Sequence, residues 1–142
     1  MRTTSWVLLT IVGAITFLVS LLSASIAYRG SYQIGPDRTT VEDVAAGRPA
    51  VLEGLRGIRG TSAAYAAAYA VLFLAIVLGP YRRGDVWAWW ALMAGIAALA
   101  GIVLLRMAFI SSRLGIGAAL IPTGLALVAL LLDVRRLSAR AA

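Results

Sequence analysis

The chain contains no cysteine, histidine, lysine or asparagine among its 142 residues. Without cysteine it can form neither a disulfide nor a thiolate metal site. Without histidine and lysine it also lacks the bases that activate serine or cysteine nucleophiles in the common hydrolases. Its six acidic residues do not cluster as a metal site would require. The sequence therefore leans against an enzyme, and it predicts no catalytic residue, no metal site and no cofactor.

Charge is scarce too, because only 13% of the residues are charged while 61% are hydrophobic. Soluble domains are about 45–50% apolar. A helix needs about 20 apolar residues to cross a bilayer, and four long apolar runs are present, at about 6–27, 61–79, 86–105 and 114–132. A membrane barrel would instead alternate polar and apolar residues along each strand. We expect an all-α integral membrane protein, with four transmembrane helices in an antiparallel bundle that forms a single domain over residues 1–142.

The first apolar run shares some features with a secretory signal peptide. Arg2 precedes it, and the small residues of segment 25–27 follow it as a cleavage site would. Signal peptides, however, have an apolar core of about 7–15 residues, and this run is longer. We expect it to stay in the protein as the first membrane span.

Four spans place both termini and segment 80–85 on one face of the membrane, and loops 28–60 and 111–113 on the other. All four tryptophans lie at the first of these faces, as interfacial aromatic residues do. Arginines in short segments near span ends mark the cytoplasmic side, and Arg82 and Arg83 are of this kind. We expect a multi-pass protein of the inner (plasma) membrane, with both termini in the cytoplasm.

The first loop carries helix signals of its own. The stretch TTVE at 39–42 has the form of a capping box, in which the Thr39 side chain bonds the first turn and Glu42 reaches back. Such a box starts a helix that buries one face and exposes the other. We expect a short amphipathic helix near residues 40–46, lying at the membrane surface.

Two further residues in this loop mark helix boundaries. Gly47 supplies the end of the short helix, and Pro49 suits the first turn of a new one. No glycine-rich or low-complexity linker follows, so the new helix has no evident reason to stop before the second apolar run. We expect an ordered loop over 28–60, whose second helix starts near Pro49 and continues into the membrane.

Helices in lipid associate through small residues that allow close backbone approach, helped by hydroxyl groups. The first run has such residues on one helical face, at Gly13, Thr16, Ser20, Ser23 and Ala27. The second run has a row of small residues at Gly60, Ala64 and Ala68, beside an aromatic row at Tyr65, Tyr69 and Phe73. We interpret these rows as packing faces, with a polar path or a binding platform as the alternative.

Arginines gather at the face that carries the long loop, where span ends bear Arg29, Arg56, Arg59, Arg106 and Arg113. They can extend to lipid phosphates or pair with acidic residues of the loop. Alternatively, several can face inward and hold an anionic headgroup or solute, which the planar guanidinium group suits. The candidate ligand-binding residues under this second interpretation are Arg59, Arg106, Arg56, Glu53, Tyr65 and Tyr69.

An Arg-x-x-Arg element, Arg56 and Arg59, stands before the second of four spans. This plan resembles the MAPEG family of glutathione-conjugating membrane enzymes. That family carries asparagine and glutamate beside the arginine, whereas the matching stretch of this chain, 61–64, reads Thr-Ser-Ala-Ala. The resemblance therefore implies no activity here.

Two functions from different classes remain. We expect a non-enzymatic membrane protein that acts by association, as an accessory, scaffold or lipid-binding subunit. Its partners would be membrane lipids, further copies of itself or a larger membrane complex. The net charge of +7 lies on arginines that flank spans, so nucleic acid is not an expected partner. The alternative is a small transporter or channel, or a lipid-modifying enzyme, whose arginines hold an anionic ligand at one membrane face.

Overall fold

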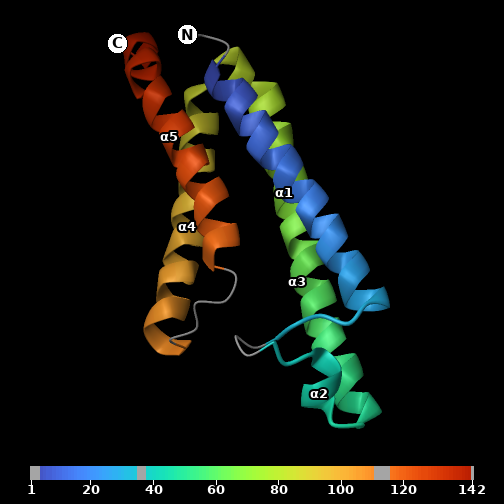
Figure 1. Cartoon of the computed structure of the whole chain (residues 1–142). Coiled ribbons are helices and arrows are strands. Elements are labelled where there is room, and N and C mark those ends of the chain that lie inside the picture. The colour runs from blue at the N-terminus through green and yellow to red at the C-terminus, as the bar shows by residue number, and fades with distance from the viewer. Residues whose placement is uncertain (1–3, 35–37, 111–115, 142) are drawn as a thin grey trace. The chain divides into compact units, whose positions relative to one another are not determined.

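A computed structural model describes residues 4–34, 38–110 and 116–141, with side chains over 5–34, 38–105 and 120–134. Regular structure in this part of the chain is helical, apart from one isolated antiparallel bridge between Gln33 and Thr40. Its elements are α1 (Thr4–Arg29), α2 (Val41–Ala45), α3 (Pro49–Ile76), the π-helix η1 (Val77–Tyr81), α4 (Val86–Ile110) and α5 (Ile116–Ala141) (Figure 1). The all-α prediction is confirmed.

Three of the described helical stretches are long and apolar enough to cross a membrane: Ser5–Arg29, Pro49–Tyr81 and Val86–Leu105. A shorter apolar stretch, Leu120–Val134, lies in α5. These stretches indicate a multi-pass membrane protein. The fourth expected span, 114–132, begins outside the described residues, and its described part is shorter than the about 20 residues that a crossing needs.

The connection between the second and third spans is tighter than the sequence predicts. A turn was expected over 80–85, but α3 passes through η1, which contains Pro80, and the chain turns only at Gly84, where φ is 93°. Proline lacks an N–H group, and its ring crowds the carbonyl of the preceding turn. The wider π turn changes the hydrogen-bond register there. Proline therefore does not end this helix, and the non-helical turn is confined to residues 84–85, at the end of the predicted segment 80–85.

The chain divides into two compact units. Unit 1 comprises Met1–Ala14 and Val71–Ala142, and unit 2 comprises Ile15–Ala70. Unit 1 has a buried apolar core formed by Leu9, Val12, Phe73, Val77, Tyr81, Ala88, Leu92, Ile96, Ala126, Ala129 and Leu130. Figure 1 shows α4 and α5 side by side in this unit, in agreement with the core residues that they share.

Polar side chains in unit 1 join helices that are distant in sequence. The Tyr81 hydroxyl donates to the Asp133 carboxylate over 2.8 Å, and both residues are buried. The Trp89 indole N–H donates to the backbone carbonyl of Leu130 over 3.0 Å. Both bonds end on one stretch of α5, so they tie η1 and α4 to the same turns of that helix.

Close backbone approach occurs in unit 1 at Gly13. A Cβ atom built on this glycine would lie 2.7 Å from Cδ2 of Leu74 and 3.1 Å from the Phe73 ring. The remaining members of the predicted row on α1 lie in unit 2, where Ser20 and Ala27 are buried and Thr16 and Ser23 are half-buried. Each of these residues lies on the covered side of α1, as a packing face requires.

The predicted small-residue row on α3 is wrong in its spacing. In unit 2 the buried positions are Gly60, Ala63 and Ala70, while Ala64 and Ala68 are exposed. Successive steps of four residues advance about 40° around a helix and leave the packing face within two steps, whereas alternating steps of three and four stay on it. The Tyr28 ring lies against Gly60, where any Cβ atom would overlap it.

The same drift separates the three members of the aromatic row. Tyr65 is 74% exposed and Tyr69 is 36% exposed in unit 2, whereas Phe73 is 6% exposed in unit 1. Only the last of the three contributes to an apolar core. The row is therefore not a continuous binding platform.

The bond between Tyr81 and Asp133 can be tested by removing one hydroxyl. Tyr81→Phe keeps the buried ring but takes a donor from a buried carboxylate, which should lower the free energy of unfolding by about 1–3 kcal/mol. Unfolding in mixed detergent micelles, followed by circular dichroism, measures this loss. Tyr65→Phe is the matched control, because Tyr65 is exposed and should tolerate the same change. Equal stability of the two variants would contradict this role for the bond.

Candidate functional site

A folded cap covers the beginning of α3 in unit 2. We define the cap as residues 30–34 and 38–48, which include α2. Its two extended segments pair through the Gln33–Thr40 bridge, with Ile34 N–H donating to the Thr39 carbonyl over 2.9 Å. Figure 1 shows α2 beside the first turns of α3. The predicted short helix is therefore present, and residues 35–37 of the predicted ordered loop lie outside the described residues.

The capping box of α2 lies one residue later than predicted. The N-cap is Thr40, whose hydroxyl accepts from the Asp43 N–H over 3.3 Å, while Asp43 accepts from the Thr40 N–H over 2.8 Å. The sequence TTVED offers two such boxes, and the bridge selects the second because it holds Thr39 in the extended segment. Because Asp43 supplies the capping carboxylate, the carboxylate of Glu42 is not used in capping.

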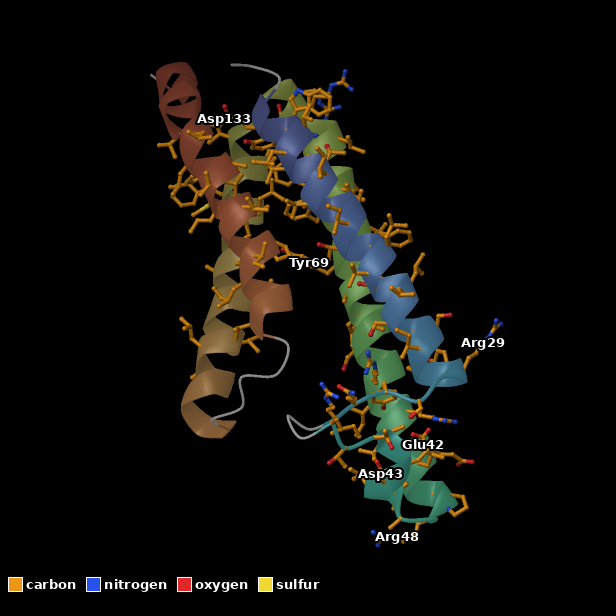
Figure 2. All side chains as sticks on the ribbon, in the orientation of Figure 1. Arg29, Glu42, Asp43, Arg48, Tyr69 and Asp133 are labelled. Carbon is orange, nitrogen blue, oxygen red and sulfur yellow. The ribbon has the colours of Figure 1, made fainter. Side chains whose placement is uncertain are left out.

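Glu42 lies where three segments of unit 2 meet (Figure 2). The Ser31 hydroxyl donates to one carboxylate oxygen over 2.5 Å, and Nη2 of Arg56 lies 3.0 Å from the other. These contacts lower the pKa of Glu42 below its ordinary value of 4.5, with the Ser31 hydrogen bond as the largest cause, ahead of the Glu42 backbone N–H and of Arg56. One carboxylate thus ties α2 to both the end of α1 and the third turn of α3.

Tyr32 makes the second contact between the cap and α3. Its hydroxyl donates to the Leu55 carbonyl over 3.1 Å, and its own carbonyl accepts from Val41 N–H over 3.0 Å. The Arg59 guanidinium lies over the ring, with Cζ 4.1 Å from the centroid. This distance is within the range of a cation–π interaction. Tyr32 is therefore held both by its hydroxyl group and by its backbone, with its ring against the guanidinium group.

The two arginines of the Arg-x-x-Arg element have different partners. Arg56 pairs with Glu42 through Nη2, and its Nε is buried without a hydrogen-bond partner in the described part of the chain. Arg59 stacks on Tyr32 instead. The predicted pairing between span-end arginines and acidic residues of the loop is thus confirmed for Arg56.

The structure brings together only part of the predicted ligand set. Glu53 is exposed on α3, and Tyr65 and Tyr69 are exposed two and three turns beyond Arg59. Arg106 belongs to α4, but its side chain lies outside the described part, as does all of Arg113. Arg56 and Arg59 remain, and the structure adds Ser31, Tyr32 and Glu42 to them.

Sequence reasoning singled out neither Ser31 nor Tyr32. Each lies in an irregular loop, far along the chain from the α3 residues around it, so no helical periodicity relates them. The only available signals were a tyrosine in a polar loop and an arginine in need of a partner. The bridge at Gln33 supplies the missing long-range information, because it fixes where the two loop segments lie.

Further arginines surround the cap. Arg29, Arg38 and Arg48 are exposed, and Arg38 has a positive φ of 66°. Figure 2 shows Arg29 at the end of α1 and Arg48 beyond α2, each pointing away from Glu42. The cap thus carries two arginines and two acidic residues, so its charges balance, and the Glu42 side chain is 41% exposed.

A second group of arginine and aromatic residues lies in unit 1. The Arg82 guanidinium lies over the Trp6 ring, with 4.9 Å between Cζ and the centroid, and Arg83 lies 3.8 Å from the Asp85 carboxylate. Arg82 and Arg83 are exposed. This arrangement matches the interfacial anchors that flank membrane spans, and its ionic contact is longer than that between Arg56 and Glu42, with a more exposed arginine.

Comparison with protein-family models, with characterised proteins and with solved structures finds no match to this chain.

The lowered pKa of Glu42 makes the cap sensitive to acid. A carboxylate with a lower pKa in the folded state stabilises that state fully above its unfolded pKa, and the stabilisation is lost as the pH falls through the folded value. Protection of the 40–46 amides from hydrogen exchange, corrected for intrinsic rates, should therefore be constant above about pH 4.5 and fall below it. In Glu42→Gln this pH dependence should be weaker, with the part that remains coming from the capping carboxylate of Asp43. Unchanged acid sensitivity in that variant would contradict the assignment.

Proposed function

We propose that the chain is a four-helix membrane protein that acts by association, as an accessory or scaffold subunit that presents a folded cap at one membrane face. The three apolar spans and the apolar part of α5 support a four-helix plan. An antiparallel arrangement then puts the cap at the membrane face opposite Arg82 and Arg83. Arginines are dense in the short 80–85 connection, which supports a cytoplasmic location for that connection.

The main support for the proposal is that the Glu42 carboxylate of the cap is bonded to other groups of the protein. Glu42 receives one hydrogen bond from Ser31, which joins two segments of the cap, and it pairs with Arg56, which holds the cap to α3. A catalytic carboxylate would need an open position toward a substrate. Glu42 instead acts as a structural joint, which favours a surface of fixed shape over a reaction centre.

The cap also exposes apolar side chains beside its basic ones. Val44 of α2 is 42% exposed, and Ile58 of α3 is 68% exposed near the same end of the helix. Apolar residues held on a fixed surface are typical of positions where proteins dock. They support association through the cap and α3 beside it, with a further protein of the membrane as the partner.

The second candidate is a protein that holds an anionic ligand, and Arg59 is the residue that favours it. Its guanidinium group is held by a ring and not by a carboxylate. A stacked arginine can bind an anion without catalysing a reaction, so this second candidate is compatible with a scaffold that binds lipid.

Association can be tested by photo-crosslinking in cells. A benzophenone amino acid at Val44 should give discrete protein adducts, whereas one at Leu18, which is exposed along the first span, should react chiefly with lipid. Glu42→Ala removes the hydrogen bond from Ser31 and the ion pair with Arg56, and it should weaken the Val44 adducts several-fold. If Val44 gives no protein adduct, or if the adducts survive Glu42→Ala unchanged, the cap is not the associating surface.

The threading can be tested separately, because the chain has no cysteine of its own. Gln33→Cys in the cap and Arg83→Cys in the short connection both create exposed thiols. A membrane-impermeant maleimide added to intact cells should label the first and leave the second unlabelled until the cells are opened. Labelling of Arg83→Cys from outside would reverse the proposed orientation.

A further inference from the structure

Arg59 is the last charged residue of α3 before its apolar stretch. No charged residue follows until Arg82, so the intervening helix is roughly 30 Å long, close to the thickness of the hydrocarbon layer. A side chain at position 59 is therefore at the level of the lipid headgroups. Phosphate is the anion present there at the highest concentration.

The stacking of Arg59 leaves its hydrogen-bonding capacity unused. A guanidinium group carries five N–H donors, all of them in its plane, and a cation–π contact engages only the flat face. Tyr32 occupies that face at 4.1 Å, and no described residue accepts a hydrogen bond from the Arg59 side chain. The residue is half-buried, and its nitrogens are not among the buried atoms without a partner, so these donors can reach an acceptor outside the described residues.

The positive charge of Arg59 is not paired with a carboxylate among the described residues. Of the two carboxylates of the cap, Glu42 accepts from Ser31 and Arg56, and Asp43 accepts from the N–H and hydroxyl of Thr40. The ion pairs in the described part of the chain are Arg56 with Glu42 and Arg83 with Asp85. Arg59 thus offers a full charge together with a planar set of donors, which matches the geometry of two phosphate oxygens.

The ring beneath Arg59 is fixed before any ligand arrives. Tyr32 is held by its hydroxyl at Leu55 and by its carbonyl at Val41, a residue that is fully buried. Leu55 lies one turn before Arg59 on the same helix, so the ring spans that turn and supports the guanidinium group from below. A fixed arginine loses less conformational freedom on binding than a mobile one.

From these observations we propose that Arg59, supported by Tyr32, binds a phosphodiester oxygen pair of a membrane phospholipid headgroup. The inference deepens the proposed function, because it names the lipid chemistry that a scaffold of this kind would bind, and it depends on the membrane placement of α3. The same chemistry could recognise free phosphate, but the location at the headgroup level favours lipid. Arg56 takes no direct part, since Glu42 occupies it.

The test is native mass spectrometry of the purified full chain with two lipids that have the same acyl chains. Phosphatidylglycerol has the phosphodiester, and diacylglycerol lacks it. The wild-type chain should retain one phosphatidylglycerol in preference to diacylglycerol. Arg59→Gln should weaken phosphatidylglycerol binding about tenfold, the effect expected for losing hydrogen bonds to a charged group. Arg59→Lys, which keeps the charge but not the planar donors, should bind with intermediate strength.

The matched control is Arg83→Gln. It removes the same charge from an exposed side chain whose contact with Asp85 is long, so it should leave lipid binding within about twofold of wild type, as expected of an exposed charge. Equal losses in Arg59→Gln and Arg83→Gln, or equal binding of the two lipids, would overturn the proposal. Binding of inorganic phosphate without a preference for phosphatidylglycerol would overturn its lipid part.

Folding of the variants is checked by hydrogen exchange of the 40–46 amides, which reports on the cap directly. Lost lipid binding with a protected cap in Arg59→Gln supports the site. Wild-type lipid binding in that variant overturns it, whatever the state of the cap. The proposed association is tested independently by adducts from Val44, which can persist when the lipid site is absent.

Discussion

Hydrocarbon offers no hydrogen-bond partner, and this constraint governs where polar groups occur along α3. A polar group within the span must be satisfied by another helix, and a charged one must lie at the boundary. Tyr81 follows the first rule through its bond to Asp133 in unit 1. Arg59 follows the second in unit 2, where it ends the charged part of the helix. Between them the helix carries small and apolar side chains together with two tyrosines, Tyr65 and Tyr69.

The cap assigns different roles to two arginines that lie one turn apart. Glu42 has two carboxylate oxygens, and Ser31 and Arg56 occupy one each. Arg59 therefore stacks on an aromatic ring and keeps its charge and its donors. A single misplaced capping box would change this outcome, because Glu42 would then be bound to the start of α2. The position of that box thus leaves the Glu42 carboxylate available to Ser31 and Arg56.

Local features of this chain could be predicted from sequence, and long-range contacts could not. The apolar runs, the start of α3 at Pro49 and the short helix of the cap all depend on neighbouring residues, and the structure contains them. The bond between Tyr81 and Asp133 joins residues 52 positions apart, which no periodicity relates. Intermediate cases failed by small margins. A strict spacing of four residues predicts Ala64 and Ala68 on the packing face, but both are exposed because each step of four rotates about 40° around the helix.

The proposed lipid site requires that Tyr32 act only by holding Arg59. A double-mutant cycle with phosphatidylglycerol tests this most directly, using Arg59→Gln, Tyr32→Leu and the two together, with native mass spectrometry as the measurement. If the ring acts through the arginine, the double variant should bind no more weakly than Arg59→Gln alone. Losses that multiply in the double variant would contradict the account, because they would mean that the two residues contact the lipid independently.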